Sequence, residues 1–245
     1  MLDQDQMEMK EIVSSVREVF DHCFDKIGGK ANEDIRWYYR RPKTITRAAF
    51  FESALWAIWV SGMSRKAAST FLKRAEQNGL PSNHKELGSW DGRRLRSFME
   101  GLHGRPVAER SVAKWRAVRQ LANEVSAYES DSAFRTAFFQ GKRASGTLDG
   151  NDVDSLLNRN LPFIKKANAF FIVRNMGGEA IKPDRWLQAF LAHYSLTMGE
   201  LLKVLSHLSI PAGLFDLVVW CYCEEHVRDV KNFEDHFERF STKRR

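Results

Sequence analysis

The stretch Asn160–Leu191 reads NLPFIKKANAFFIVRNMGGEAIKPDRWLQAFL, and its pattern decides the fold. A short helix leads into a Leu-Pro turn, and a second helix follows from about residue 166 to residue 176. Gly177 and Gly178 then break the helical pattern. The next helix is predicted to begin at Asp184, because Pro183 moves the backbone before it away from the α region and leaves Asp184 at the N-cap.

Helical spacing also dominates the rest of the chain. Apolar residues in the segment from about 46 to 60 recur at i, i+4, i+7 and i+8, which places them on one face of a helix. Ser64 can cap the helix that follows, and a further helix is expected within residues 84–100, entered near Trp90. Alternation typical of strands is missing from the sequence. The pattern therefore predicts an all-α fold.

The composition is that of an ordinary globular protein, with 43% hydrophobic and 28% charged residues in a chain of 245. Such a length can bury a sizeable core in one domain or in two small ones. No apolar run approaches the roughly 20 residues that cross a bilayer, and the N-terminal segment is polar and acidic, unlike a secretory signal. We therefore expect an intracellular, monomeric protein that has no contact with membranes.

The charge of the chain favours anionic partners. The formal net charge is +7 and the sequence pI is about 9.4. A basic balance of this kind attracts polyanions, of which nucleic acid is the commonest, although many basic proteins bind nothing anionic. The sequence contains no phosphate-binding G-x-x-x-x-G-K-[ST] loop, no H-E-x-x-H and no G-x-S-x-G, which argues against nucleoside-triphosphate enzymes and the common hydrolases.

The cysteines predict neither disulfides nor a metal centre. There are three, Cys23, Cys221 and Cys223, and an odd number without a secretory signal argues against a disulfide framework. Cys221 and Cys223 lie close to His226, which raises the possibility of a metal site. On a helix, residues at i and i+2 point about 200° apart and cannot easily hold one ion. We expect structural cysteines and no bound metal.

Two segments of the opening stretch resemble the helix-hairpin-helix DNA glycosylases, which include the endonuclease III and 3-methyladenine glycosylase types. In that superfamily an L-P-x-x-G turn is followed by a helix, and an aspartate stands at the start of the next helix. Leu161–Lys165 matches the turn, and Lys182–Arg185, spelled KPDR, matches the aspartate segment. The resemblance implies two helical lobes with a cleft between them. Residues 46–180 would form the central lobe, with the hairpin at about 160–176, and residues 1–45 with 181–245 would form the second lobe.

The resemblance implies that Asp184 is the catalytic residue. Cleavage of an N-glycosidic bond develops positive charge on the sugar, and a fixed carboxylate stabilises that charge or activates a water molecule. The alternative role of Asp184 is that of an N-cap, which is a common use of aspartate. The two roles are compatible, because a cap holds the carboxylate in one place.

The hairpin is expected to bind double-stranded DNA. The resemblance assigns this contact to Leu161, Phe163, Ile164, Lys165 and Lys166, with a possible monovalent cation at the turn, and it adds Lys182 and Arg185 beside the aspartate. Phe163 and Lys165 stand where the family has glycines, so we expect a turn of different shape.

The family's strand-cutting members use a lysine nucleophile after the hairpin. A gap-free match places Ala167 at that position, which implies a monofunctional enzyme, and a slip of one residue would place Lys166 there. Three cysteines cannot supply the four thiolates of an iron–sulfur cluster, and no organic cofactor is implied.

Further contacts are suggested by a loop and by aromatic residues. The loop Ser61–Ser64, SGMS, resembles the loop of the 3-methyladenine glycosylases in which an apolar side chain fills the space of an extruded base. Gly62 and Met63 would contact DNA in that case, and Met63 is otherwise a core residue. Four aromatic residues could line a base pocket or pack in the core: Trp37, Tyr38, Trp56 and Trp59.

Three hypotheses of function follow. The first is a monofunctional DNA glycosylase of base-excision repair that flips a damaged or mispaired base. The second is a module of the same fold with altered or lost chemistry, which binds damaged or bent DNA. The third is an all-α interaction protein that does not meet DNA.

Overall fold

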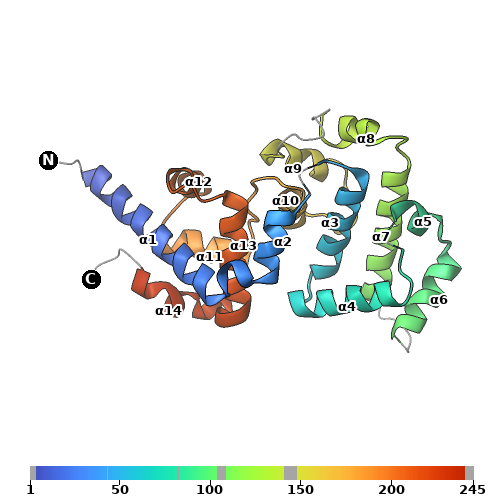
Figure 1. Ribbon diagram of the computed structural model, residues 1–245, viewed down its shortest axis with the longest axis horizontal. Coiled ribbons are helices and arrows are strands. Elements are labelled where there is room, and N and C mark those ends of the chain that lie inside the picture. The colour runs from blue at the N-terminus through green and yellow to red at the C-terminus, as the bar shows by residue number, and fades with distance from the viewer. Residues whose placement is uncertain (1–3, 43, 82, 104–108, 141–147, 241–245) are drawn as a thin grey trace. The chain divides into compact units, whose positions relative to one another are not determined.

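The computed structural model describes residues 4–42, 44–81, 83–103, 109–140 and 148–240. Over these residues the regular structure is helical and no strand occurs, so the predicted all-α class is confirmed (Figure 1). The chain divides into two compact units. Unit 1 consists of Met1–Arg41 and Glu179–Arg245, and unit 2 consists of Pro42–Gly178.

Unit 1 combines helices from both ends of the chain. Its α-helices are α1 (Gln4–Lys26), α2 (Glu33–Arg40), α11 (Arg185–His193), α12 (Met198–His207), α13 (Ala212–Tyr222) and α14 (Phe233–Phe237). Short 3-10 turns lie at η1 (Gly29–Ala31), η3 (Val230–Asn232) and η4 (Glu238–Phe240), and a π-helix, η2 (Cys223–Val227), continues α13.

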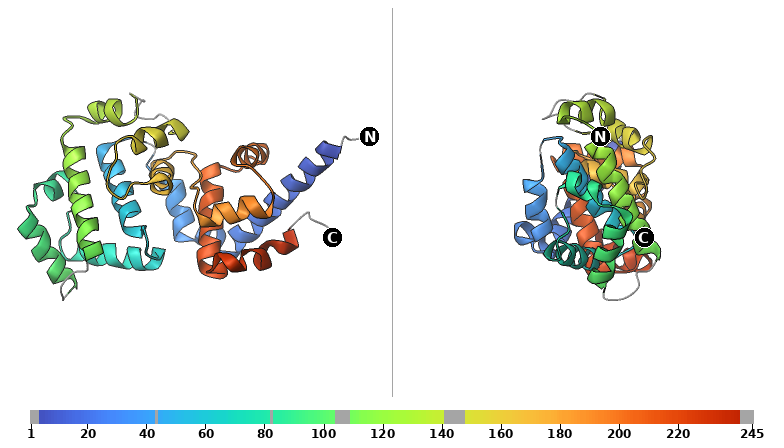
Figure 2. Two further views of the ribbon diagram at one scale, coloured as in Figure 1. Left: turned by 180° about the vertical axis from the view of Figure 1, so that it is seen from behind. Right: turned by 90° about the vertical axis from the view of Figure 1, so that its right-hand side faces the viewer.

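Helix α13 forms the centre of the core of unit 1. All of its residues from Gly213 to Tyr222 are buried, because α1, α2, α11 and α12 pack around it (Figure 2). Helix α1 faces α13 with apolar side chains spaced three or four residues apart, as an amphipathic helix requires. Phe20 of α1 stacks on Phe215 of α13 with ring centroids 6.3 Å apart.

Unit 2 is organised around two long helices, α3 and α7. Its helices are α3 (Arg47–Val60), α4 (Arg65–Gln77), α5 (His84–Ser89), α6 (Gly92–His103), α7 (Glu109–Ser126), α8 (Asp131–Phe138), α9 (Gly150–Leu157) and α10 (Lys166–Asn175). Helix α3 packs against both α7 and α10, α5 packs on α7, and α9 pairs with α10. We refer to α9, α10 and the turn between them as the hairpin.

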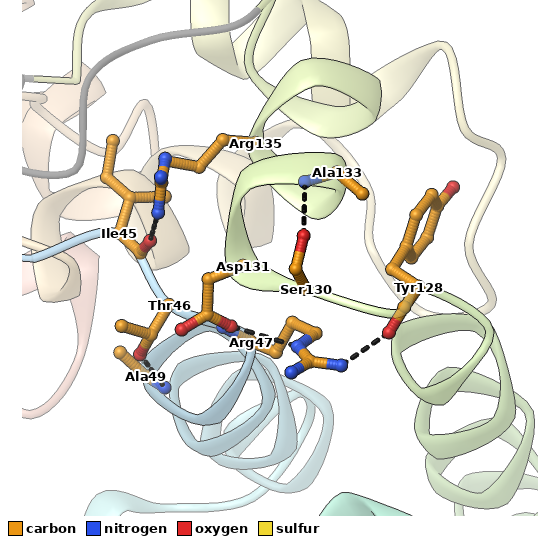
Figure 3. Close-up of polar contacts among 9 residues, drawn as sticks. All are labelled: Ile45, Thr46, Arg47, Ala49, Tyr128, Ser130, Asp131, Ala133 and Arg135. Carbon is orange, nitrogen blue, oxygen red and sulfur yellow. Dashed lines mark hydrogen bonds and ion pairs between the residues drawn. The ribbon is translucent and has the colours of Figure 1, made fainter.

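Polar contacts join the ends of three helices in unit 2 (Figure 3). Arg47, at the start of α3, donates to Asp131 Oδ1 from its Nε at 2.9 Å and from its backbone amide at 3.1 Å. Its Nη1 donates to the carbonyl oxygen of Tyr128, which follows α7. Arg135 of α8 donates to the Ile45 carbonyl oxygen at 3.1 Å. These contacts fix α8 against the beginning of α3 and the end of α7.

The predicted Gly-Gly break separates α10 from the segment that follows it. Gly177 has φ = 92°, a left-handed value that ends the helix. Gly178 has no room for a side chain, since a Cβ would lie 2.7 Å from Val173 Cγ1 and 2.8 Å from the Val173 carbonyl oxygen. Both glycines are therefore required by the local backbone.

In the described part of the chain, no single helix is both long and apolar enough to cross a bilayer. One bent pair, α12 together with α13 and η2, reaches the required length and composition, with an angle of 108° at its break.

Candidate nucleic-acid interface

The turn between α9 and α10 carries a left-handed residue that is not glycine. Phe163 has φ = 62°, a conformation that costs a residue with a Cβ about 1–2 kcal/mol. Phe163 thus adopts a positive φ although it is not glycine. Two features hold the turn: Asn168 Nδ2 donates to the Phe163 carbonyl oxygen at 2.6 Å, and Leu161 and Ile164 are buried on either side.

The start of α10 offers positive charge next to this turn. Lys165 is the N-cap residue, and its side chain makes no capping hydrogen bond. The first amides of a helix carry partial positive charge, and the exposed side chains of Lys165 and Lys166 add to it. A shallow hollow of about 420 Å³ opens here, lined by Phe163, Lys165, Asn168 and their neighbours Pro162 and Ala167, together with Ser61. Such a helix terminus suits a phosphate group.

Ser61, the first residue of the SGMS loop, lines the same hollow, although about a hundred residues separate it from the hairpin in sequence. Met63 and Ser64 line a separate hollow beside α4. Lys114, only 2% exposed, fixes the loop by donating from Nζ to the carbonyl oxygens of Trp59 at 2.8 Å and Ser61 at 2.7 Å. Gly62 has φ = 72°, which allows the sharp turn after α3. Met63 follows it and is 37% exposed. The tertiary structure therefore brings Ser61 and the hairpin to one surface of unit 2.

Asp184 lies in unit 1 as the N-cap residue of α11, as Pro183 led us to expect. Its Oδ1 accepts hydrogen bonds from the amides of Trp186 at 3.0 Å and Leu187 at 3.2 Å. Its Oδ2 lies 2.7 Å from Lys182 Nζ. Only 17% of the Asp184 side chain is exposed, so the carboxylate is rigidly held and partly enclosed.

The two basic residues that flank Asp184 are engaged within unit 1. The Lys182 side chain is 12% exposed, and its Nζ lies 4.8 Å from the centroid of the Trp220 ring. Arg185 Nη2 lies 3.1 Å from Glu224 Oε1, which also accepts from Trp186 Nε1 at 2.9 Å. Lys182 therefore neutralises Asp184 in the free protein, while more than half of the Arg185 side chain stays in solvent.

The four aromatic candidates have different surroundings. Tyr38 is 2% exposed and donates to Glu179 Oε1 at 3.0 Å, within unit 1. Trp59 is a core residue of unit 2, with its ring centroid 4.3 Å from that of Phe71. Trp56 is half-buried and Trp37 is exposed. Only Trp37 and Trp56 are therefore open to a partner in this conformation.

The cysteines are free and buried. Burial raises the pKa of the Cys23 and Cys223 thiols above their ordinary value, with a further contribution to Cys223 from nearby acidic groups. No group of three potential metal ligands occurs among the residues that the structure describes.

Two contacts at these sites were not predicted from the sequence. Nothing in the spacing indicates that Lys114 turns inward to the end of α3, since a lysine within a helix is normally exposed. The close spacing of Lys182 and Asp184 is a weak sequence signal of their ion pair, but the sequence resemblance gave Lys182 the role of a DNA contact.

In comparisons with known proteins, no family model, no curated protein and no solved structure matches the chain.

Proposed function

We propose that the protein is a DNA glycosylase-like enzyme of base-excision repair, which flips a damaged or mispaired base and hydrolyses its N-glycosidic bond. The observation that supports the chemistry best is the position of Asp184, an enclosed carboxylate held by two backbone amides. The hairpin of unit 2 supports DNA binding, because Lys165, Lys166 and the start of α10 together attract phosphate.

In the proposed reaction Asp184 acts on the sugar. As the bond between C1′ and the base breaks, its electrons leave with the base and positive charge develops on the sugar, which the carboxylate stabilises. Water supplies a hydroxyl group to C1′ and a proton to the departing base, so the products are a free base and an abasic site. Asp184 Oδ2 must exchange Lys182 for the sugar or the water during this step.

The reaction is proposed to stop at the abasic site. Lys166 is exposed at the first position of α10, where phosphate contact suits it. The hydrolysis described above uses water as the nucleophile, so no lysine needs to form a Schiff base. Met63 is proposed as the side chain that fills the space of the extruded base, since it is exposed on the turn after α3.

One observation favours a second function. Both oxygens of Asp184 already have partners, Oδ1 with the Trp186 and Leu187 amides and Oδ2 with Lys182. A carboxylate in this state can serve as a structural cap alone. The second candidate is therefore a module of the same fold that binds damaged or bent DNA without cleaving the glycosidic bond.

Base release decides between the two functions. Duplexes with a single uracil, alkylated purine, 8-oxoguanine or mismatch are incubated with wild type and with Asp184→Asn, and strand breaks are measured with and without hot alkali. Asp149→Asn is the matched control, because Asp149 also caps a helix, α9. We expect alkali-dependent breaks with wild type and the control but not with Asp184→Asn.

Two other outcomes would change the proposal. Breaks without alkali would assign Lys166 a nucleophilic role, to be checked with Lys166→Gln. Binding of DNA without release of any base, by wild type and variant alike, would contradict the catalytic role of Asp184 and support the binding module.

A further inference from the structure

Four arginines from two helices line one hollow in unit 2. Arg93 and Arg96 belong to α6, Arg116 and Arg119 belong to α7, and the hollow has a volume of about 670 Å³. Within each helix the two arginines are three residues apart, so they lie on the same face. We call this site the arginine groove, defined by Arg93, Arg96, Arg116 and Arg119.

The arginine groove has more positive charge than the described residues around it neutralise. No ion pair occurs between these four arginines and the other residues that the structure describes, and the buried Nε of Arg119 has no hydrogen-bond partner among them. Like charges three residues apart destabilise a helix by a few tenths of a kcal/mol per pair. An anion bound between the helices would remove this repulsion and supply the missing acceptor for Arg119.

Two carboxylates line the same hollow, but they do not neutralise the charge of its four arginines. Asp91 precedes α6, and its Oδ1 accepts a hydrogen bond from the Arg94 amide in the first turn of that helix at 2.7 Å. This backbone hydrogen bond, followed by contributions that include the charges of Arg93 and Arg119, lowers the pKa of Asp91. Glu100 is the second carboxylate and is exposed. Four arginines thus face two carboxylates, one of which serves as a helix cap.

The groove extends along α7 beyond the arginines. A second hollow of about 440 Å³ shares Arg116 and Arg119 and continues past Gln120 and Asn123 to Ala127. Its one carboxylate, Glu124, lies 3.6 Å from Arg159 Nη1 and so has a cation of its own. From Arg116 to Asn123 the helix rises about 10 Å. A nucleic-acid strand carries one phosphate per roughly 3.4 Å of duplex axis, so this length matches about three phosphates rather than one. Arginine, glutamine and asparagine are all common partners of phosphate oxygens.

We propose that the arginine groove and its extension along α7 bind the phosphodiester backbone of a nucleic-acid strand. This contact is separate from the hairpin, because α10 packs against α3 whereas the groove is formed by α6 and α7 (Figure 1). The groove contact goes beyond base excision. It requires no lesion, because phosphate contacts do not read the bases. Unit 2 would then hold nucleic acid at two places.

The test measures binding of undamaged, fluorescently labelled oligonucleotides, single-stranded and duplex, by anisotropy at several salt concentrations. The full-length protein is compared with Arg96→Gln/Arg116→Gln, two exposed positions in the groove. The matched control, Lys73→Gln/Arg94→Gln, removes the same charge from unit 2. Arg94 lies on α6 outside the groove, 3.9 Å from Glu86 Oε1, and Lys73 is exposed on α4.

We expect the groove variant to bind roughly tenfold more weakly, and the slope of log K against log salt to fall by about 1.4 for single strands and 1.8 for duplexes. The control variant should change affinity less than threefold. A third variant, Lys165→Gln/Lys166→Gln, measures the hairpin separately. Because base release is not measured, failure of the groove and failure of Asp184 remain distinguishable.

Three results would overturn the proposal. One is an equal loss of affinity in the groove and control variants, which would indicate that binding depends only on the net charge of the protein. Another is displacement of the oligonucleotide by poly-glutamate at the same concentration of charges, which would indicate an acidic protein partner. The third is tight binding of inorganic tripolyphosphate to wild type with no loss of oligonucleotide affinity in the groove variant, which would assign the site to a small polyphosphate.

Discussion

Lys182 Nζ lies 2.7 Å from Asp184 Oδ2, and the Trp186 and Leu187 amides donate to the other carboxylate oxygen. Asp184 therefore has two structural roles, as the cap of α11 and as the partner of a largely buried lysine. Both roles place the carboxylate in a fixed position before any ligand binds. The proposed chemistry depends on this preorganisation and on release of Lys182 from Oδ2.

The two roles of Asp184 can be separated by their effect on stability. Asp184→Asn keeps an oxygen that can cap α11, whereas Asp184→Ala loses both the cap and the ion pair. We expect Asp184→Ala to lower the free energy of unfolding by about 1 kcal/mol more than Asp184→Asn does. Urea denaturation measures the difference, with Ser130→Ala as a control that removes only the cap of α8. Equal effects of the two Asp184 variants would contradict the capping role.

The left-handed conformation of Phe163 predicts an unusual order of stability. Phe163→Ala removes the ring but keeps a Cβ at φ = 62°, while Phe163→Gly also removes the strain. We expect Phe163→Gly to be more stable than Phe163→Ala by about 1 kcal/mol, the reverse of the order in a helix. Thermal unfolding of the two variants, with Phe170→Gly and Phe170→Ala in α10 as the matched helical pair, provides the measurement. Higher stability of Phe163→Ala would rule out the left-handed turn.

Lys114 is predicted to stabilise the loop that carries Met63. Lys114→Met keeps the length of the side chain but leaves the carbonyl oxygens of Trp59 and Ser61 without this donor. We expect a loss of about 2 kcal/mol or more in the free energy of unfolding, and faster amide hydrogen exchange at Gly62 and Met63. Lys73→Met on the exposed face of α4 should change neither quantity. Unchanged exchange in Lys114→Met would show that the loop is held by other contacts.

Asp131 should contribute to the loss of stability in acid. Its burial opposes ionisation, but the hydrogen bonds and charge of Arg47 outweigh this and lower the pKa of Asp131 below its ordinary value of 3.8. Because the pKa in the folded state is the lower one, the contribution is present above pH 3.8 and is lost as the pH falls through the folded-state value. Asp131→Asn should therefore be less stable than wild type at pH 7, with a difference that narrows below pH 3.8.

Urea titrations of wild type and Asp131→Asn at a series of pH values measure this difference. Asp154→Asn, which removes the charge of an exposed side chain of α9, controls for net charge. A constant difference between wild type and Asp131→Asn at all pH values would contradict the role of the Arg47–Asp131 pair.

The sequence by itself determined that the described chain is helical and where several helices begin. Apolar spacing, Ser64, Pro183 and Asp184 act within one or two helical turns, so their effect can be read from neighbouring residues. The Gly177–Gly178 break is also a local signal, because it ends α10 through the backbone conformation of the two glycines. The turn between α9 and α10 could be predicted because a Leu-Pro pair separates two short helical patterns.

Only the tertiary structure decided how individual side chains are used. Phe163 keeps a positive φ because Asn168 and buried neighbours hold its backbone, and Lys114 turns inward because α3 ends beside α7. The arginine groove arises where α6 and α7 meet, although each helix alone contributes only two arginines to it. Local sequence specifies the backbone of each helix, whereas burial, ion pairing and shared hollows depend on which helices come together.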